Sequence, residues 1–244
     1  MTGLSVVIPS KTAANLSACV AAIWKHEPDR AGLRIIVIDD GLDWRTVMPD
    51  GQPYNAPGAA LIPARLLQMV DGIKPFIFAR NCNLGIKAAG DDSVILLNDD
   101  ALLESPGGFT LLQRAAEEHP EYGLISATTD VAGNTAQWRR EGGRLRTCPS
   151  PTPGNSFSTV AFVCVLIPRR TIETVGLLDE RFDPGMFEDN DMCRRIAQVR
   201  LKIGIHDGCL VNHSRLQPTF RASPTVGADL ERARQIYLKK WGSM

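Results

Sequence analysis

The sequence has no excess of charge of either sign and no long apolar run. Its 244 residues include 27 Lys plus Arg and 27 Asp plus Glu, so the formal net charge is zero. A general binder of phosphate backbones carries a basic excess, so nucleic acid is not favoured as a partner. No window reaches the roughly 18 apolar residues that a membrane-spanning helix needs. The first residues also lack the pattern of a secretory signal, so we expect a cytoplasmic protein without a transmembrane segment.

The six cysteines are scattered and form no C-x-x-C pair. Cys164 lies inside the apolar run "VAFVCVLI", where a buried side chain is expected. This distribution does not indicate a disulfide framework or a zinc site. The sequence predicts buried thiols that act as small apolar side chains.

A glycine-rich phosphate-binding fingerprint is missing after the first predicted strand. The apolar runs Leu4–Pro9 and Leu33–Asp40 are typical of strands covered on both faces, and residues 15–26 between them have helical spacing. The turn after the first run reads "PSKTAAN" rather than G-x-G-x-x-G. A Rossmann dehydrogenase is therefore disfavoured, although the strand–helix–strand order remains.

The rest of the chain alternates strands and helices up to about residue 130 and then changes character. Further strands are predicted at 75–79, 93–98, 122–129 and 159–168, with one or two more within 203–214. Helices are predicted at 83–90, 108–119, 169–176, 188–202 and 227–241, and a short one near 64–70. We expect one compact α/β domain over residues 1–244, with functional halves 1–130 and 131–244.

Acidic pairs follow two of the predicted strands. Asp39–Asp40 ends one apolar run and Asp99–Asp100 ends another, "VILLNDD". Ligands bind outside the carboxyl ends of strands in open parallel sheets, so these pairs are expected at one rim. Mg²⁺ or Mn²⁺ would offset the repulsion between them, because carboxylates are preferred ligands of these ions. The alternative is that each Asp caps a helix or starts a turn.

A second acidic cluster lies at the start of the predicted helix 188–202. Glu188 or Asp189 could project into a cleft as a general base, or the cluster could be an ordinary acidic first turn. Asp191 and Arg195 have i, i+4 spacing, so a structural ion pair is expected between them. His213 follows an apolar segment and could be a metal ligand, a phosphate contact or a structural hydrogen-bonding residue.

Taken together, these motifs resemble the family 2 glycosyltransferases, which use nucleotide sugars. The matching segments are "SVVIPS", "VIDDG", "ARNCNLGIKAAGDDSVILLNDD", "VGLLDERFDPGMFEDNDMCRRI" and "VNHS", over roughly residues 4–215. Asn98 stands at a position where Asp is frequent in this family. Asn at this position is common in the rhamnosyltransferase-like members. The resemblance implies a GT-A type fold, with a Rossmann-like, mostly parallel sheet flanked by helices.

The resemblance also implies roles for residues on the donor side. Pro9 and Ser10 would line the base pocket, and Asp40 would contact the base or the ribose. Arg80 would lie near the base or the diphosphate, and Asp99 nearer the ribose.

The remaining implied roles concern the metal and the chemistry. Asp100 would bind a divalent cation, Mn²⁺ or Mg²⁺, and His213 would lie near the metal and the diphosphate. Asp189 matches the catalytic base, with Glu188 beside it. The implied reaction is inverting transfer of a sugar from a UDP- or dTDP-sugar to a glycan, lipid-linked or other hydroxyl acceptor.

Two other classes of function stay open, and so do the roles of three segments. A sugar-phosphate nucleotidyltransferase would need a Gly-rich basic loop after the first strand, which the sequence lacks, and a non-catalytic sugar-nucleotide-binding scaffold would not need Glu188–Asp189. The loops 41–75 and 139–156 could be lids or acceptor walls. The Arg-rich stretch 138–146 could attract an anionic acceptor or simply be solvated. The final helix is expected to pack on its own domain, with peripheral contact at the inner membrane face as the alternative.

Overall fold

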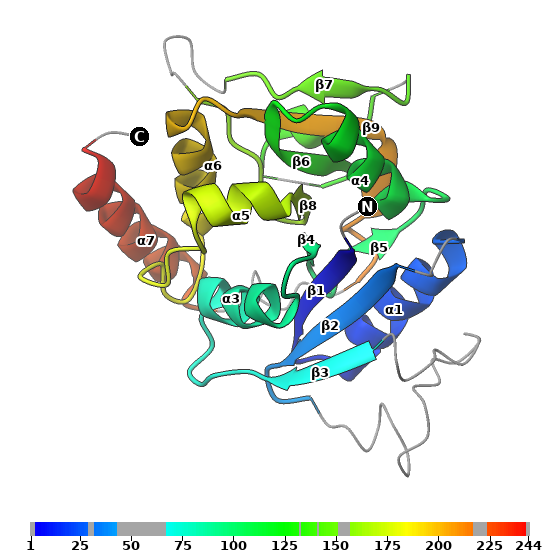
Figure 1. Ribbon diagram of the computed structural model, residues 1–244. Helices are drawn as coiled ribbons and strands as arrows, with labels where there is room; N and C mark the ends of the chain where they lie inside the picture. The colour runs from blue at the N-terminus through cyan, green and yellow to red at the C-terminus, as the bar shows by residue number, and fades with distance from the viewer. Residues whose placement is uncertain are drawn as a thin grey trace.

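The computed structural model describes residues 3–28, 32–42, 67–131, 133–140, 142–150, 157–216 and 224–242, and these form a nine-stranded sheet with helices on both faces (Figure 1). The strands are β1 (Leu4–Ser10), β2 (Leu33–Asp39), β3 (Leu67–Asp71), β4 (Ser93–Leu97), β5 (Leu102–Leu103), β6 (Tyr122–Thr129), β7 (Leu145–Thr147), β8 (Cys164–Ile167) and β9 (Lys202–Asn212). The helices are α1 (Ala13–His26), α3 (Phe78–Ala88), α4 (Gly108–Glu118), α5 (Arg169–Val175), α6 (Glu188–Gln198) and α7 (Val226–Trp241), with a 3₁₀ turn η3 (Thr135–Gln137).

The sheet changes direction at β8. Its order is β3-β2-β1-β4-β8-β6-β9-β5, with β7 paired to β9. Strands β3, β2, β1 and β4 run parallel, whereas β8 is antiparallel to both β4 and β6. The carboxyl end of β4 therefore lies beside the start of β8, where the Asn98 amide donates to the Val163 carbonyl at 3.0 Å. Segments from the two halves of the chain meet at this edge.

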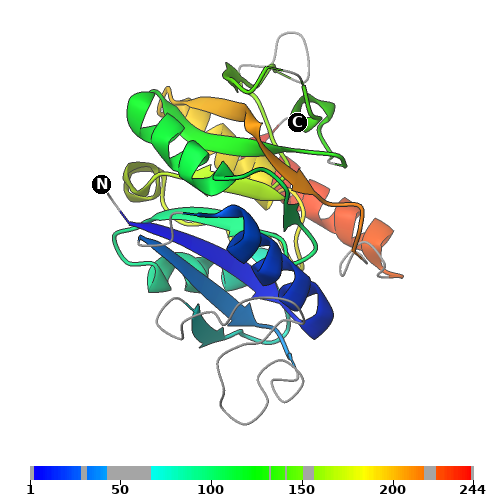
Figure 2. The same cartoon turned by 90° about the vertical axis from the view of Figure 1, so that its right-hand side faces the viewer.

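Each face of the sheet has its own apolar core. Helices α1 and α4 cover one face, where Leu16 and Phe109 are buried. Helices α3, α5 and α6 cover the other face with Cys82, Ile172 and Met192. Figure 2 shows the two helical layers on either side of the sheet. The sheet is thus enclosed over most of its area, and this explains its continuous apolar runs.

Helix α3 lies very close to the first strand. A Cβ atom added to Gly85 would come within 2.2 Å of Cγ1 of Val7, a buried residue of β1. Only a residue without a side chain fits this contact, so Gly85 sets the depth at which α3 packs on the sheet.

Helix α7 packs on its own domain, as expected. Ala233 and Tyr237 of this helix form a third apolar cluster with Phe182. The Trp241 indole donates a 2.9 Å hydrogen bond to Asp191 of α6. No helix in the described ranges is long and apolar enough to cross a membrane.

Asp191 is the centre of the contact between α6 and α7. Its carboxylate is fully buried and receives Arg195 Nε at 2.9 Å, which confirms the expected i, i+4 pair. Lys240 Nζ lies 2.6 Å from the other oxygen, which also accepts the Trp241 hydrogen bond. A buried carboxylate with three donors holds the two helices in a fixed relation.

Most predicted elements are present, and one region is wrong. The strand predicted at 75–79 does not form: α3 begins at Phe78, and the strand of this region is β3. The short helix predicted near 64–70 is contradicted from Leu67 onward by β3, and its earlier residues lie outside the described ranges. Ile77 and Phe78 pack against the same core as α3, so their apolar character reflects helix packing.

Three other expectations concern cysteines and loops. All six cysteines are buried thiols, as predicted. Residues 43–66 of the Pro-rich stretch and residues 141 and 151–156 of the second loop lie outside the described residues. Within residues 133–150 the structure has the 3₁₀ turn η3 and the short strand β7, so the described part of the Arg-rich stretch 138–146 includes the start of a strand.

Candidate active site

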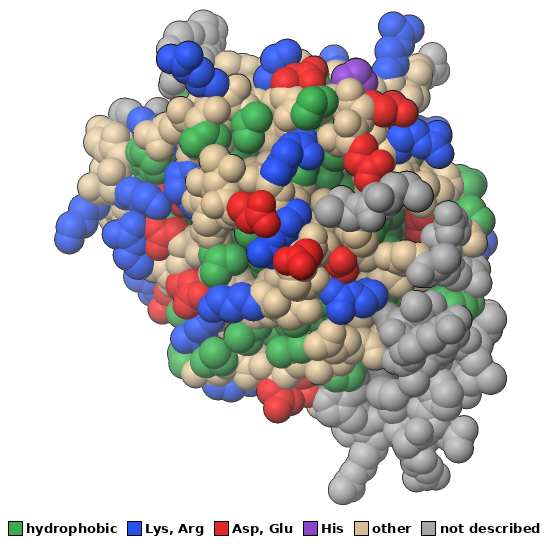
Figure 3. Space-filling model, in the orientation of Figure 1, with side chains coloured by type: hydrophobic (Ala, Val, Ile, Leu, Met, Phe, Trp, Pro, Cys, Tyr) green, Lys and Arg blue, Asp and Glu red, His purple; other side chains and the backbone are tan. Residues whose placement is uncertain are grey.

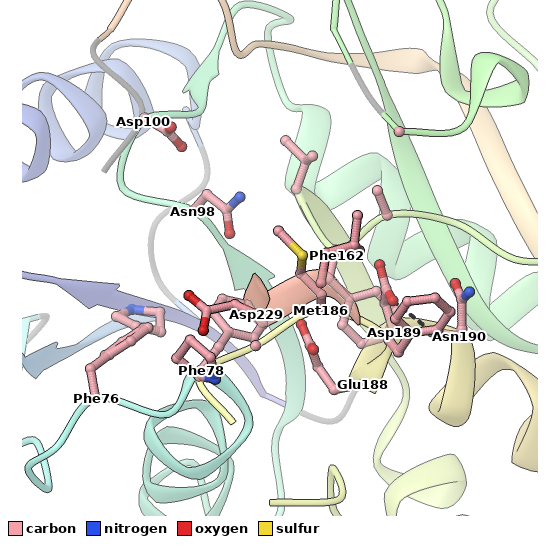
Figure 4. A pocket seen from close by; sticks show the side chains of 18 of the residues that line it. Phe76, Phe78, Asn98, Asp100, Phe162, Met186, Glu188, Asp189, Asn190 and Asp229 are labelled. Carbon is pink, nitrogen blue, oxygen red and sulfur yellow. Dashed lines mark hydrogen bonds between the residues drawn. The ribbon is translucent and has the colours of Figure 1, made fainter. Parts of the chain in front are cut away.

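A cavity of about 720 Å³ opens at the edge where β4 meets β8. The segments that follow β1, β2 and β4 line one side of it, as expected for a ligand site at strand ends. Residues 159–163, the start of α6 and the first turns of α7 line the other side. Figure 4 shows Asn98 and Asp100 across the cavity from Glu188 and Asp189. The two acidic clusters found in the sequence therefore face one space.

Asp99 is fixed to the end of the first strand. Ser10 Oγ donates a 2.6 Å hydrogen bond to Asp99 Oδ2, and both side chains are buried. Burial raises the pKa of Asp99 to about 6, the Asp100 charge adds to this shift, and the Ser10 hydrogen bond opposes it. The Ser10–Asp99 hydrogen bond thus joins the ends of β1 and β4 at the cavity.

Asp100 lies against His213, which is 113 residues further along the chain. His213 Nε2 is 3.1 Å from Asp100 Oδ1, and His213 Nδ1 is 3.0 Å from the Val131 carbonyl oxygen. A carbonyl only accepts, so Nδ1 carries a proton in this contact. Nε2 then either carries a second proton or turns a lone pair toward the carboxylate, an arrangement that a cation stabilises.

The pair Asp100–His213 fits a cation that a ligand also coordinates. Among the described residues no group of three or more His, Cys, Asp or Glu side chains is arranged to hold a metal ion. Mg²⁺ is commonly held by one or two protein ligands and completed by substrate phosphates and water. One carboxylate and one imidazole suit such a shared site, and do not suit an all-protein cage.

Asp40 also lines the cavity and is paired with a residue that the sequence analysis did not single out. Lys74 Nζ lies 2.5 Å from Asp40 Oδ1 and also donates to the Asp40 carbonyl. The Asp40 side chain is buried, whereas Lys74 is largely exposed. Phe76 and Phe78 also line the cavity (Figure 4). Pro9 and Ser10 also line the cavity, and their contact with a nucleotide base stays a prediction.

Arg80 is placed differently from the other donor-side residues. Its guanidinium donates to the carbonyls of Ile73, at 3.2 Å, and Pro75. Arg80 is not among the residues that line the cavity. In this structure it supports the loop between β3 and α3, which carries Lys74 and Phe76.

The pair Glu188–Asp189 begins α6 after an unusual turn. Met186 and Phe187 have φ values of 74° and 67°, in the left-handed region that non-glycine residues rarely adopt. Such strained backbone recurs where side chains must be aimed at a site. Here the turn brings Glu188 and Asp189 to the cavity wall at the amino end of the helix.

Both carboxyl groups of this pair bind protons more tightly than usual. Burial raises the pKa of Asp189 to about 6, although the Asn190 amide donates to Oδ1 at 2.7 Å and opposes the shift. Burial raises the pKa of Glu188 well above its ordinary range, and the Asp189 charge adds to this. Burial therefore favours the protonated form of both carboxyl groups more than water does.

Two other parts of the cavity wall, one acidic and one apolar, were not predicted from the sequence. Asp229 of α7 and the segment that contains Phe162 line the cavity opposite Asp99 and Asp100. In the sequence, Asp229 reads as an ordinary acidic first-turn residue of a helix. No signal in the sequence pairs α7 with the start of α6, because the contact depends on the tertiary fold.

Comparisons with known proteins add a fold to this geometry. No protein-family model matches the chain, and no curated protein matches it. Among solved structures it is similar to GalNAc-T7, in a crystal structure with UDP, GalNAc and Mn²⁺, with a TM-score of 0.66. The similarity covers 97% of this chain at 16% sequence identity. The chain therefore has a GT-A type α/β fold, as the sequence resemblance implied.

The likeness extends over only part of the other protein. This chain spans about half of the GalNAc-T7 chain, 48% of its length. At this identity the match describes the fold, and the activity must be argued from the cavity. Membership of family 2 and likeness to rhamnosyltransferases stay predictions.

Proposed function

We propose that the protein is an inverting glycosyltransferase that moves a sugar from a nucleoside diphosphate sugar to an acceptor hydroxyl. The observation that supports this best is one cavity with two opposed acidic sides, Asp99–Asp100 with His213 and Glu188–Asp189. The first side suits a diphosphate that shares a cation with the protein. The second side suits proton removal from an attacking hydroxyl.

The donor would occupy the strand-end side of the cavity. Pro9, Ser10 and Asp40 would surround the base and ribose, and Asp99 would lie near the ribose. UDP- and dTDP-sugars are the proposed donors, and the presence of UDP in the similar GalNAc-T7 crystal agrees with this. We assign donor binding to the half 1–130 and acceptor binding to the half 131–244.

Asp100 and His213 would hold Mn²⁺ or Mg²⁺ on this side of the cavity. When bound, such an ion acts as a Lewis acid that stabilises the charge of the leaving diphosphate. The Mn²⁺ in the GalNAc-T7 crystal is consistent with this assignment.

Asp189 is the proposed general base. With a pKa of about 6 it is mainly ionised at neutral pH and still accepts a proton readily. Burial also raises the pKa of Glu188, well above its ordinary value, which disfavours the ionised form that a base needs, so we assign the role of base to Asp189. The acceptor oxygen attacks the anomeric carbon as the bond to the diphosphate breaks, and the hydroxyl proton passes to Asp189. One displacement of this kind inverts the anomeric configuration.

The test is the set of products formed from nucleotide sugars. Purified protein is incubated with UDP- and dTDP-sugars, Mn²⁺ and a set of acceptors, and released nucleotide and product anomer are measured. Free nucleoside diphosphate and an inverted product are expected. Pyrophosphate formed from a sugar phosphate and a nucleoside triphosphate would indicate a nucleotidyltransferase instead. Donor binding with neither transfer nor hydrolysis would indicate a scaffold.

The proposed setting is the cytoplasm. Contact with the inner membrane face through a lipid-linked acceptor would be peripheral. Fractionation of cells that express the full chain, with and without a salt wash of the membranes, tests both statements.

A further inference from the structure

The acceptor side of the cavity is unusually rich in carboxyl groups. Glu188, Asp189 and Asp229 line it together with apolar and uncharged polar residues. Among the described lining residues, the basic ones are Lys11 and His213, and both belong to the strand-end side. The group that brings the acceptor hydroxyl therefore meets negative charge on its own side of the cavity.

Asp229 is held firmly at this wall. Its side chain is buried, and Thr225 Oγ1 donates to Oδ2 at 2.8 Å while Arg232 donates to Oδ1 at 2.9 Å. Arg232 is about half exposed and also donates to the Asp183 carbonyl, so its charge lies toward the outside. Figure 4 shows the Asp229 carboxylate beside Phe78 in the cavity. Each carboxylate oxygen retains a lone pair that accepts a further hydrogen bond.

Glu188 provides a second polar group without a protein partner. The residue is only 6% exposed, and its Oε2 atom has no hydrogen-bond partner in the described part of the chain. Figure 4 draws its carboxyl group toward the interior of the cavity, on the side of Met186. A buried polar atom without a partner is costly, and a small shift of the Glu188 side chain that exposes Oε2 to a ligand hydroxyl would remove the cost. Burial raises the pKa of Glu188 and so favours its protonated form, which can donate a hydrogen bond as well as accept one.

Apart from Lys11, the Lys and Arg residues of the described part of the chain are not among those that line the cavity. Lys and Arg side chains gather at the left edge in Figure 3, over α7. Arg139 and Arg140 of the Arg-rich stretch are exposed and are not among the residues that line the cavity. The cavity thus offers no described cation on the acceptor side that would neutralise an anionic acceptor group.

We propose that the group presenting the acceptor hydroxyl is an uncharged sugar, which Asp229 and Glu188 bind through its hydroxyls, and that Asp229 selects against a negative charge beside the reacting hydroxyl. This inference rests on the proposed glycosyl transfer and names the class of acceptor. A lipid or phosphate carried on the far side of that sugar stays outside the cavity and is compatible with it.

The size of the selection follows from Coulomb repulsion. Two unit charges about 7 Å apart, at an effective dielectric constant of about 20, repel enough to weaken binding roughly 10- to 100-fold, and the Arg232 guanidinium, 2.9 Å from Asp229, offsets part of this repulsion. An acceptor that carries a carboxylate on the sugar ring should therefore be used roughly 3- to 30-fold less well than its neutral counterpart.

The test uses matched pairs of acceptors with the proposed donors and Mn²⁺. Aryl glucoside and glucuronide, aryl galactoside and galacturonide, and glycerol and glycerate differ mainly by one negative charge. Values of kcat/KM are measured for the wild type, Asp229→Asn and the control Glu117→Gln. Glu117 is exposed on α4, on the other side of the sheet, so the control removes a charge far from the cavity.

The wild type and Glu117→Gln should show a higher kcat/KM for the neutral acceptor of each pair. In Asp229→Asn the ratio of the two kcat/KM values should be closer to one. Leu230 lines the cavity and is 46% exposed, so it tolerates a charged side chain. Leu230→Lys should also narrow the preference and Leu230→Glu should widen it, and these variants decide the matter if Asp229→Asn does not fold.

Failure of this inference is distinct from failure of the proposed function. If nucleoside diphosphate is released and the anionic acceptors react at the same rate as the neutral ones, the inference is overturned but glycosyl transfer is not. The same holds if nucleoside diphosphate is released and the neutral acceptors do not react. Absence of both donor binding, measured by thermal shift, and nucleotide release overturns the proposed function and the inference with it.

Discussion

Replacing Asp189 by Asn should make the protein more stable and almost inactive. The carboxylate at this position is half-buried and lines the cavity beside Glu188. Asn retains the Oδ1 acceptor for the Asn190 amide and removes the charge. A general base usually contributes about 10²- to 10⁴-fold, so turnover should fall by at least that factor while the donor still binds.

The gain in stability follows from the pKa. Folding raises the pKa of Asp189 from its ordinary value of 3.8 to about 6, because burial disfavours the charged form. Roughly two pKa units correspond to about 3 kcal/mol of unfolding free energy at a pH above both values. Asn loses one of the two carboxylate acceptors, so a net gain of about 1 to 3 kcal/mol is expected. For a chain of this length that raises Tm by roughly 2 to 10 °C.

The sign of the pH dependence is fixed by the direction of the shift. The folded state binds the Asp189 proton more tightly than the unfolded state does, so the wild type loses stability as the pH rises from about 4 through about 6. Asp189→Asn has no carboxyl group at this position, so its stability does not fall in this way as the pH rises. The difference in Tm should therefore be largest near pH 8 and roughly half as large near pH 5.

The assay combines thermal unfolding at the two pH values with a pH profile of sugar transfer. Wild-type kcat should rise through about pH 6 as the base becomes ionised. An Asp189→Asn protein with normal turnover would refute the base assignment. A difference in Tm that is the same at both pH values would refute the raised pKa.

The remaining predictions concern the metal and the packing. Asp100→Ala should abolish the Mn²⁺-dependent part of a thermal shift with UDP-sugar, which is about 2.7 kcal/mol at a hundredfold excess over Kd; an unchanged metal response would contradict its role. Asp191→Asn leaves the buried charge of Arg195 uncompensated and should cost about 3 to 5 kcal/mol in urea unfolding, whereas a cost near zero would contradict the buried ion pair. Gly85→Ala places a Cβ 2.2 Å from Val7 and should cost about 1 to 3 kcal/mol, part of which Val7→Ala restores; an unchanged Tm would contradict the close contact.

The sequence predicts those parts of the fold whose residues have one dominant environment. β1, β2, β4 and β6 are continuous apolar runs because helices cover both faces of the sheet. Acidic pairs at the ends of two such runs predict a ligand rim, because parallel strands end at a common edge. Asp99 and Asp100 lie at the cavity for this reason.

Other parts depend on contacts that no local pattern records. The stretch "PFIFA" has the composition of a strand, but Ile77 and Phe78 pack as the first residues of a helix. Lys74 faces Asp40 across 34 residues, and Asp229 reaches the cavity because α7 is fixed to α6. Such pairings arise from the tertiary fold, and no local spacing in the sequence predicts them.

The two walls of the cavity come from different segments of the chain, which meet where β4 pairs with the antiparallel strand β8. Residues up to Asp100 supply the strand ends that suit a donor, whereas residues 159–163, 184–190 and the start of α7 supply the opposite wall. The two sets adjoin along the β4–β8 pairing but are built on different elements. Substitutions in the second set can therefore change which acceptor binds without altering the donor side. The same sheet can thus combine one type of donor site with acceptor walls of different specificity.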